Sequence, residues 1–248
     1  MFESIVNPIF APLLKLPPLA GILIISIVIT VLITLIYKWT TDQNLMKQLK
    51  DEIKEFQKEA KTLKSDPQKA MEVQKKAMQT NMKYMMQSFK PMLFTFIPII
   101  IIFGWLNTNM AYEPILPDTE FTTTMFFTNN FVGEAELVAP EGITLISEAK
   151  QKIAAGKAEW ALTGAEGEYI LEYKFNDKSF TKDLLITNER VYKAPQKKIK
   201  DSEVKLIKIN NEKLKVLNLF GWQIGWLGTY ILFSIVLSIV LRKILKVY

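Results

Sequence analysis

Hydroxyl side chains recur at every fourth position in two apolar stretches of the sequence. The first series is Ser26, Thr30, Thr34 and Lys38, and the second is Tyr230, Ser234, Ser238 and Arg242. Because residues four apart share one face of a helix, each series predicts a polar stripe that ends in a positive charge. Thr95 is the matching hydroxyl of a third apolar stretch.

Two interpretations of these hydroxyls stay open. They can allow close helix packing and satisfy backbone groups inside a membrane. Alternatively, the stripes converge on a water-holding groove, with Lys38 and Arg242 as charges at its mouth. The predicted groove residues are Ser26, Thr30, Thr34, Thr95, Ser234 and Ser238.

Methionines form a second group of candidate residues, just before the stretch that contains Thr95. Met71, Met78, Met82, Met85 and Phe89 fall on one stripe of a helix. Methionine is flexible and polarisable, so a methionine-rich face suits binding of unlike apolar partners. The predicted docking residues are Met78, Met82, Met85, Met86 and Met92. The other interpretation is that they fill the interior of a helix bundle.

The residue inventory excludes most enzyme chemistry. With no cysteine and no histidine, the chain has no thiol nucleophile, no disulfide, no imidazole base and neither the thiolate nor the imidazole ligands that zinc sites use. Ser238 and Lys243 are five residues apart on a helix and would point apart, which argues against a serine–lysine dyad. We therefore expect no enzyme, no catalytic residue, no cofactor and no metal site.

Three uncharged stretches set the class of protein. Residues 19–37, 91–110 and 217–241 carry no charge, and each is near or above the ~20 residues that a helix needs to cross a bilayer. The expected fold is therefore an α-helical membrane protein with three spans. The expected parts are an outer interfacial helix (1–17), spans at 18–37, 91–110 and 217–241, a hairpin (38–90), a β-rich domain (111–216) and a tail (242–248).

The charged segment 38–90 predicts a helical hairpin with coiled-coil packing. Apolar residues recur at steps of three and four in its first half, namely Leu45, Leu49, Ile53, Phe56, Ala60 and Leu63. A break follows, with a turn expected at residues 65–67, where Asp66 can cap a helix and Pro67 suits its first position. The return helix carries a packing stripe of Val73, Ala77, Thr80 and Tyr84 beside the methionine stripe.

Charge asymmetry predicts the orientation in the membrane. Residues 38–90 hold 12 lysines against 7 acids, whereas residues 111–216 hold 15 basic residues against 17 acids. Positive residues favour the cytoplasmic side. We expect a multi-pass protein of the plasma membrane with the hairpin and C-terminus in the cytoplasm and the N-terminus outside.

The long segment between the second and third spans changes character. Alternating and β-branched residues predict strands over 120–127, 167–176, 178–187 and 203–210. Their spacing is typical of a small antiparallel β-sandwich on the outer side. A short helix is expected over 147–155, and the scattered charges predict a solvated surface.

Residues 83–94 (KYMMQSFKPMLF) and 103–106 (FGWL) resemble the archaeal DUF106 proteins of the Oxa1/YidC/EMC3/TMCO1/Get1 superfamily. The resemblance covers about residues 18–110 and 217–246. It implies an insertase, which takes a hydrophobic client segment from the cytosol through a polar groove into the bilayer. The implied partners are newly made membrane proteins, the lipid bilayer and a ribosome or targeting factor, but no DNA.

Two departures from the family pattern stand out. The bacterial members carry a positive residue within the groove, whereas no Lys or Arg lies inside a predicted span here, and the nearest candidates are Lys38 and Arg242. The β-rich loop is an insertion that the minimal family core lacks. An alternative function is an envelope scaffold or sensor whose outer β-domain binds a ligand or partner.

Overall fold

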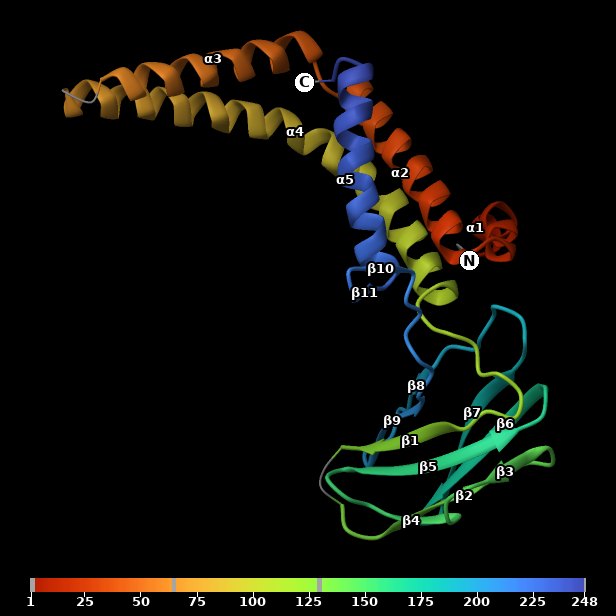
Figure 1. Ribbon diagram of the computed structural model, residues 1–248. Coiled ribbons are helices and arrows are strands. Elements are labelled where there is room, and N and C mark those ends of the chain that lie inside the picture. The colour runs from red at the N-terminus through yellow and green to blue at the C-terminus, as the bar shows by residue number, and fades with distance from the viewer. Residues whose placement is uncertain (1–2, 64–65, 129–130, 248) are drawn as a thin grey trace. The chain divides into compact units, whose positions relative to one another are not determined.

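The computed structural model describes residues 3–63, 66–128 and 131–247, which form two compact units (Figure 1). The helical unit is Met1–Trp105 with Leu227–Tyr248, and the β unit is Leu106–Trp226. The helices are α1 (Glu3–Phe10), α2 (Pro18–Thr40), α3 (Gln43–Thr62), α4 (Pro67–Asn109) and α5 (Trp226–Ile244), with a 3-10 helix η1 (Ala11–Lys15).

Three of these helices, α2, α4 and α5, are long and apolar enough to cross a membrane, as predicted. The third span differs from the expected 217–241, because α5 begins only at Trp226. Before it, β10 (Leu217–Leu219) and β11 (Trp222–Ile224) pair as a hairpin. Phe220 and Gly221 have φ of 52° and 91°, the pattern of a two-residue hairpin turn, which ends any helix there.

The return helix of the hairpin and the second span, expected as 38–90 and 91–110, share one continuous helix, α4. Pro91 and Pro98 lie inside it, where each removes a backbone donor without ending the helix. Asp66 caps its start, since the Lys69 amide donates to Asp66 Oδ1 at 3.2 Å. Residue 65 of the predicted turn, like residue 64 before it, lies outside the described residues.

Helices α3 and α4 bury the stripes expected of the hairpin. Leu49 on α3 and Val73 and Thr80 on α4 are buried, while Ile53 and Phe56 are half-buried. One detail differs: Met46, rather than Leu45, is fully buried, because it packs with Tyr37 and Val247. The two helices of the predicted hairpin are confirmed, whereas their packing as a coiled coil stays a prediction.

The N-terminal segment, expected as one interfacial helix over 1–17, is helical in two pieces, α1 and η1. It packs against α4. Trp105 Nε1 donates to Asn7 Oδ1 at 2.9 Å, and the rings of Phe10 and Trp105 lie 5.4 Å apart. Its position at a membrane surface stays a prediction.

The β unit contains two main antiparallel sheets, in the strand orders β3-β5-β1-β9-β8 and β4-β2-β6-β7. The strands are β1 (Phe121–Phe127), β2 (Glu134–Val138), β3 (Ile143–Leu145), β4 (Lys150–Lys152), β5 (Lys157–Gly164), β6 (Gly167–Phe175), β7 (Lys178–Ile186), β8 (Gln196–Lys198) and β9 (Val204–Ile209). All four predicted strands are present, as β1, β6, β7 and β9.

The helix expected over 147–155 is wrong. Lys150–Lys152 form β4, which pairs with β2, and the Ile153 amide donates to the Gly133 carbonyl at 2.9 Å. The segment has good helix formers, but weak local propensity gives way to strand pairing and to the core beneath it. Ala155, with φ of 51°, then turns the chain into β5.

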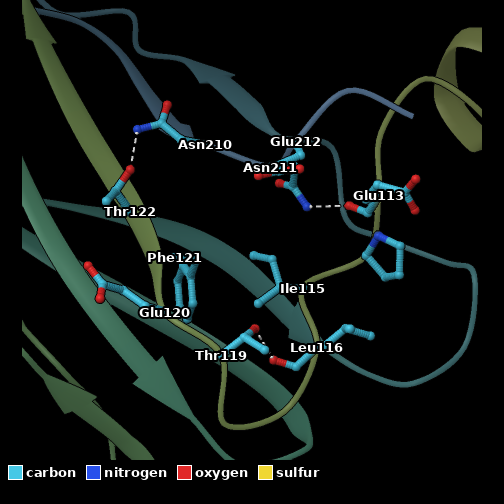
Figure 2. Close-up of a pocket in the computed structure, with 11 residues that line it drawn as sticks. Glu113, Ile115, Leu116, Thr119, Glu120, Phe121, Thr122, Asn210, Asn211 and Glu212 are labelled. Atoms are coloured by element: carbon cyan, nitrogen blue, oxygen red, sulfur yellow. Dashed lines mark hydrogen bonds between the residues drawn. The ribbon is translucent and has the colours of Figure 1, made fainter. Parts of the chain in front are cut away.

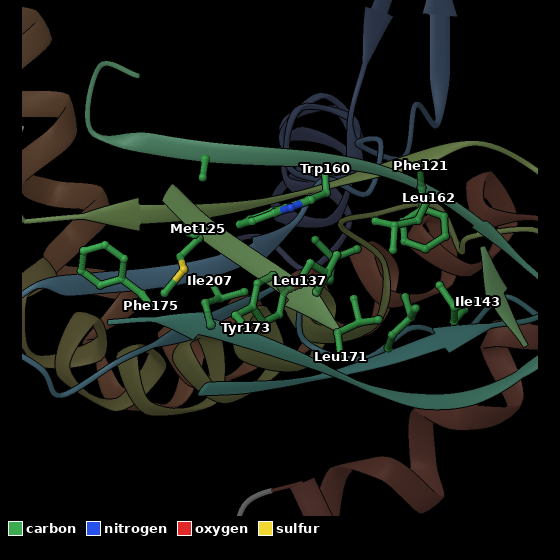
Figure 3. Close-up of a cluster of buried hydrophobic side chains, with 14 of the residues drawn as sticks. Phe121, Met125, Leu137, Ile143, Trp160, Leu162, Leu171, Tyr173, Phe175 and Ile207 are labelled. Carbon is green, nitrogen blue, oxygen red and sulfur yellow. The ribbon is translucent and has the colours of Figure 1, made fainter. Parts of the chain in front are cut away.

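One hydrophobic core lies between the sheets (Figure 3). Trp160, Leu162, Leu171 and Tyr173 are fully buried in it. The Tyr173 hydroxyl lies 2.6 Å from Thr123 Oγ1, which donates to the Lys208 carbonyl at 3.1 Å. Burial raises the pKa of Tyr173 far above its ordinary value, so its hydroxyl stays protonated and donates to Thr123.

This chain of hydrogen bonds predicts unequal effects of removing either hydroxyl. Tyr173→Phe removes one donor whose acceptor keeps other bonds, so we expect a loss of about 1 kcal/mol in the free energy of opening of the β unit. Thr123→Val leaves the buried Tyr173 hydroxyl without an acceptor and should cost more, about 1–3 kcal/mol. Hydrogen exchange of the β6 and β7 amides measures both, and equal losses would contradict the assignment.

Candidate functional site

The hydroxyls of α2 are buried and bonded to their own helix. Ser26 Oγ donates to the Ile22 carbonyl at 2.7 Å, Thr30 Oγ1 to the Ser26 carbonyl at 2.6 Å, and Thr34 Oγ1 to the Thr30 carbonyl at 2.7 Å. Ile25 and Ile29 are buried too. The predicted polar stripe therefore lies on the packed side of α2, beside apolar residues.

A cavity of about 390 Å³ lies between α2 and α5; we call it the α2–α5 cavity. Its volume falls within the roughly 300–1,000 Å³ of ordinary ligand pockets. Helix α2 contributes Thr30, Ile33 and Thr34, and α5 contributes Tyr230, Ser234, Ile235, Ser238, Ile239 and Arg242. Two separate hydroxyl series thus meet at one hollow.

Not every predicted groove residue lines this cavity. Ser26, Thr95 and Lys38 are outside its lining. Thr95 Oγ1 donates to the Met92 carbonyl at 3.0 Å, and Lys38 is exposed. Of the two predicted charges at the mouth, the structure therefore brings only Arg242 to the cavity.

Arg242 is held by an aromatic ring that the spacing argument missed. Its guanidinium carbon lies 4.8 Å from the centre of the Tyr37 ring, within the ~6 Å range of cation–π attraction. The Tyr37 hydroxyl lies 3.1 Å from Ser88 Oγ on α4. The only sequence signal was that Tyr37 sits next to the end of the first hydroxyl series.

The end of α5 folds back into the same place. The Val247 amide donates to the Arg242 carbonyl at 2.9 Å and the Lys246 amide to the Lys243 carbonyl at 3.4 Å, a Schellman arrangement that closes a helix. Lys246 adopts the positive φ of 52° that this motif needs. Val247 is thereby buried against Tyr37 and Met46.

The methionines of α4 are exposed, opposite the face that packs on α3. Met78, Met82, Met85, Met86 and Met92 are 64, 57, 57, 71 and 59% exposed. Phe89, between them, is 63% exposed. We call these six residues the methionine surface. Since the buried neighbours are Val73 and Thr80, the interpretation of these methionines as bundle filler is not supported by their burial.

The β unit has a larger cavity, of about 660 Å³, that the sequence did not indicate (Figure 2). Ile115 and Phe121 lie on its wall with Asn210 and Asn211. Its three carboxylates, Glu113, Glu120 and Glu212, have no ion pair among the described residues. In the described part of the chain they form no cluster able to hold a metal ion. We call this cavity the carboxylate pocket.

These features define an integral membrane protein with three candidate spans and a hydroxyl-lined cavity between two of them. A family model described as integral membrane protein EMC3/TMCO1-like matches residues 4–133. The match covers just over half of the chain, and the chain belongs to this family, a member of the Oxa1/YidC/EMC3 insertase superfamily. No curated protein and no solved structure matches. Helix α5 and most of the β unit lie beyond the matched residues.

The cavity generates a prediction about water access. Single cysteines at Thr34, Ser234 and Ser238 should react with a small aqueous thiol reagent in membranes, because they line the cavity. Cysteines at Ile27 and Val28, which are exposed on α2 away from it, should face lipid and react slowly. The native chain has no cysteine, so each label is unique. Equal slow reaction at all five positions would support packing alone.

Proposed function

We propose that this protein is a membrane insertase that passes hydrophobic client segments from the cytosol through the α2–α5 cavity into the bilayer. One observation carries the proposal: two hydroxyl series, separated by nearly the whole chain, line one cavity that reaches Arg242. Membership of the EMC3/TMCO1-like family supports it. The proposal includes no catalytic chemistry, cofactor or metal.

The physical task is to carry polar flanks of a client across hydrocarbon. An unsatisfied backbone group there costs several kcal/mol, and a central charge costs about 2.5–3.5 kcal/mol on insertion scales. Hydroxyls at Thr34, Ser234 and Ser238, with the Arg242 guanidinium, extend a polar environment into the span region. A client flank that follows this wall has a shorter path through hydrocarbon.

The methionine surface is the proposed docking site for the client before insertion. It lies on α4, the helix that also forms the second candidate span. Exposed Leu93, Phe94 and Ile97 continue the apolar surface along the same helix. A client that leaves the methionines therefore meets apolar residues on the way to the bilayer. The proposed partners are newly made membrane proteins, delivered by a ribosome or targeting factor.

The proposed orientation places the N-terminus outside and the hairpin and C-terminus in the cytoplasm of a plasma membrane, with the β unit outside. The lysine excess of residues 38–90 supports it. In intact cells, a cysteine at Lys61 should resist an impermeant maleimide, whereas one at Asp177 should react. Both residues are exposed, so burial does not confuse the result. The opposite labelling pattern would overturn the orientation.

Removal of the cavity hydroxyls should impair the insertion of clients with polar flanks but leave the fold intact. We expect the quadruple variant Thr30→Val, Thr34→Val, Ser234→Ala and Ser238→Ala to fold, since hydrogen bonds of this kind average only about 0.6 kcal/mol in membranes. Clients with charged, translocated flanks should insert poorly, while purely apolar clients should insert normally.

The matched control for this experiment is Thr30→Ser with Thr34→Ser, which keeps the hydroxyls. In reconstituted vesicles, insertion of both client types is measured by protease protection. If the quadruple variant inserts both types as well as the native protein does, the groove mechanism is excluded.

Removal of the methionine surface should weaken docking and leave the fold intact. Because Met78, Met82 and Met85 are exposed, their replacement by Ser should change the melting temperature little, but should reduce photocrosslinks from residue 86 to a nascent client. Replacement of exposed Gln74, Gln79 and Asn81 by Ser is the control. Unfolding of the methionine variant would show that these side chains are core.

A second candidate function is supported by the carboxylate pocket. Its volume and unpaired carboxylates suit a cationic ligand or partner of the β unit, as expected of an envelope scaffold or sensor. Photocrosslinking from residues 34, 95, 234 and 85 during synthesis of a membrane protein separates the two functions. Nascent-chain adducts support the insertase, whereas an absence of adducts favours the scaffold or sensor.

A further inference from the structure

The turn between β10 and β11 carries large apolar side chains that the protein itself does not cover. Phe220 is 108% exposed and Trp222 is 70% exposed. Leu219, the third of the group, is 37% exposed. Neither the core of the β unit nor the carboxylate pocket includes any of them.

The backbone conformation at Phe220 is unfavourable for a phenylalanine. Phe220 has φ of 52°, a conformation that a bulky residue rarely adopts and that Asn or Gly adopts readily in such a turn. Gly221 follows with φ of 91°, and its amide donates to Asn218 Oδ1 at 2.9 Å. Since Phe220 is fully exposed among the residues that the structure describes, contacts with them do not offset the cost of phenylalanine at this position.

Two positive charges precede the hairpin. Lys213 and Lys215 are exposed and have no ion pair within the described residues, and Glu212 is the one acidic residue next to them in sequence. Exposed aromatic rings beside lysines are typical of segments that sit at a membrane interface, where rings enter the headgroup region and lysines meet lipid phosphates.

The chain connection brings the hairpin close to the bilayer whatever the orientation of the two units. Helix α5, Trp226–Ile244, has 19 residues and so spans about 28 Å, close to the ~30 Å of hydrocarbon. Trp226 therefore marks one hydrocarbon boundary. Phe220 is six residues away and within roughly 20 Å of Trp226 even along a fully extended chain.

We propose that the β10–β11 hairpin is a membrane anchor, which inserts Phe220 and Trp222 into the lipid interface of the leaflet where α5 begins. Its occupant is the lipid surface, because the hairpin continues directly into a span and carries the aromatic and lysine residues of an interface. The anchor limits how far α5 can slide along the membrane normal. This inference does not depend on the insertase proposal.

The test uses the full chain in vesicles of phosphatidylcholine and phosphatidylglycerol, with a single cysteine at Leu219 that carries an environment-sensitive fluorophore. We expect a blue-shifted emission that nitroxide on shallow acyl carbons quenches more strongly than nitroxide on deep carbons. A label at Val132, which is 96% exposed on the β unit, is the matched control and should show no lipid quenching. Equal quenching at the two positions would exclude the anchor.

A substitution then distinguishes lipid contact from other reasons for exposure. Phe220→Asn relieves the backbone, so stability should stay equal or rise, while lipid quenching at residue 219 should be lost. Trp222→Ser should reduce the quenching as well. If Phe220→Asn lowers stability, or if cysteines at residue 220 crosslink two copies efficiently, the side chain serves a protein contact and the anchor is overturned.

Discussion

The helical unit depends on the contacts around the Tyr37 ring. Tyr37 lies in the last turn of α2. Met46 of α3 packs on it, Ser88 of α4 lies within hydrogen-bond distance of its hydroxyl, and Arg242 of α5 lies over its face. Without the ring, Arg242 would lose its aromatic contact at the cavity wall. The Schellman motif turns the chain back after α5, so that Val247 packs in the same cluster as Tyr37 and Met46. Tyr37 thus contacts Arg242 of the cavity lining, although Tyr37 does not itself line the α2–α5 cavity.

Buried polar side chains in the candidate spans have their hydrogen bonds satisfied within the protein itself. In the described part of the chain, no buried side-chain nitrogen or oxygen lacks a hydrogen-bond partner. The hydroxyls of Ser26, Thr30 and Thr34 bond to carbonyls of their own helix, which suits a bilayer where water is absent. The cavity can therefore remain polar at its wall while the helices around it stay stable.

Short-range patterns in the sequence predicted what local geometry determines. The four-residue spacing placed Thr30, Thr34, Ser234 and Ser238 on two helix faces, and the 3.6-residue period separated buried Val73 from exposed Met78. Strand alternation predicted β1, β6, β7 and β9. Long-range packing was beyond these patterns: Tyr37 beneath Arg242, α1 against Trp105 and the carboxylate pocket each join segments far apart in sequence. The helix expected over 147–155 failed because strand pairing outweighed local propensity.

The hydrogen bonds within α2 also determine whether its hydroxyls can act as donors or as acceptors toward a group in the cavity. Each hydroxyl proton of Thr30 and Thr34 is already engaged by a carbonyl, so the oxygen lone pairs are what remain. Ser234 is in the same state, with its proton on the Tyr230 carbonyl at 2.7 Å. These three oxygens can therefore act as hydrogen-bond acceptors for amide N–H groups and ammonium groups. Arg242 supplies charged donors for a carboxylate, and the hydroxyls of Tyr230 and Ser238 on the same wall can donate as well. A carboxylate in this cavity would therefore meet its one cationic partner at Arg242, and an ammonium group would meet acceptor oxygens at Thr30, Thr34 and Ser234.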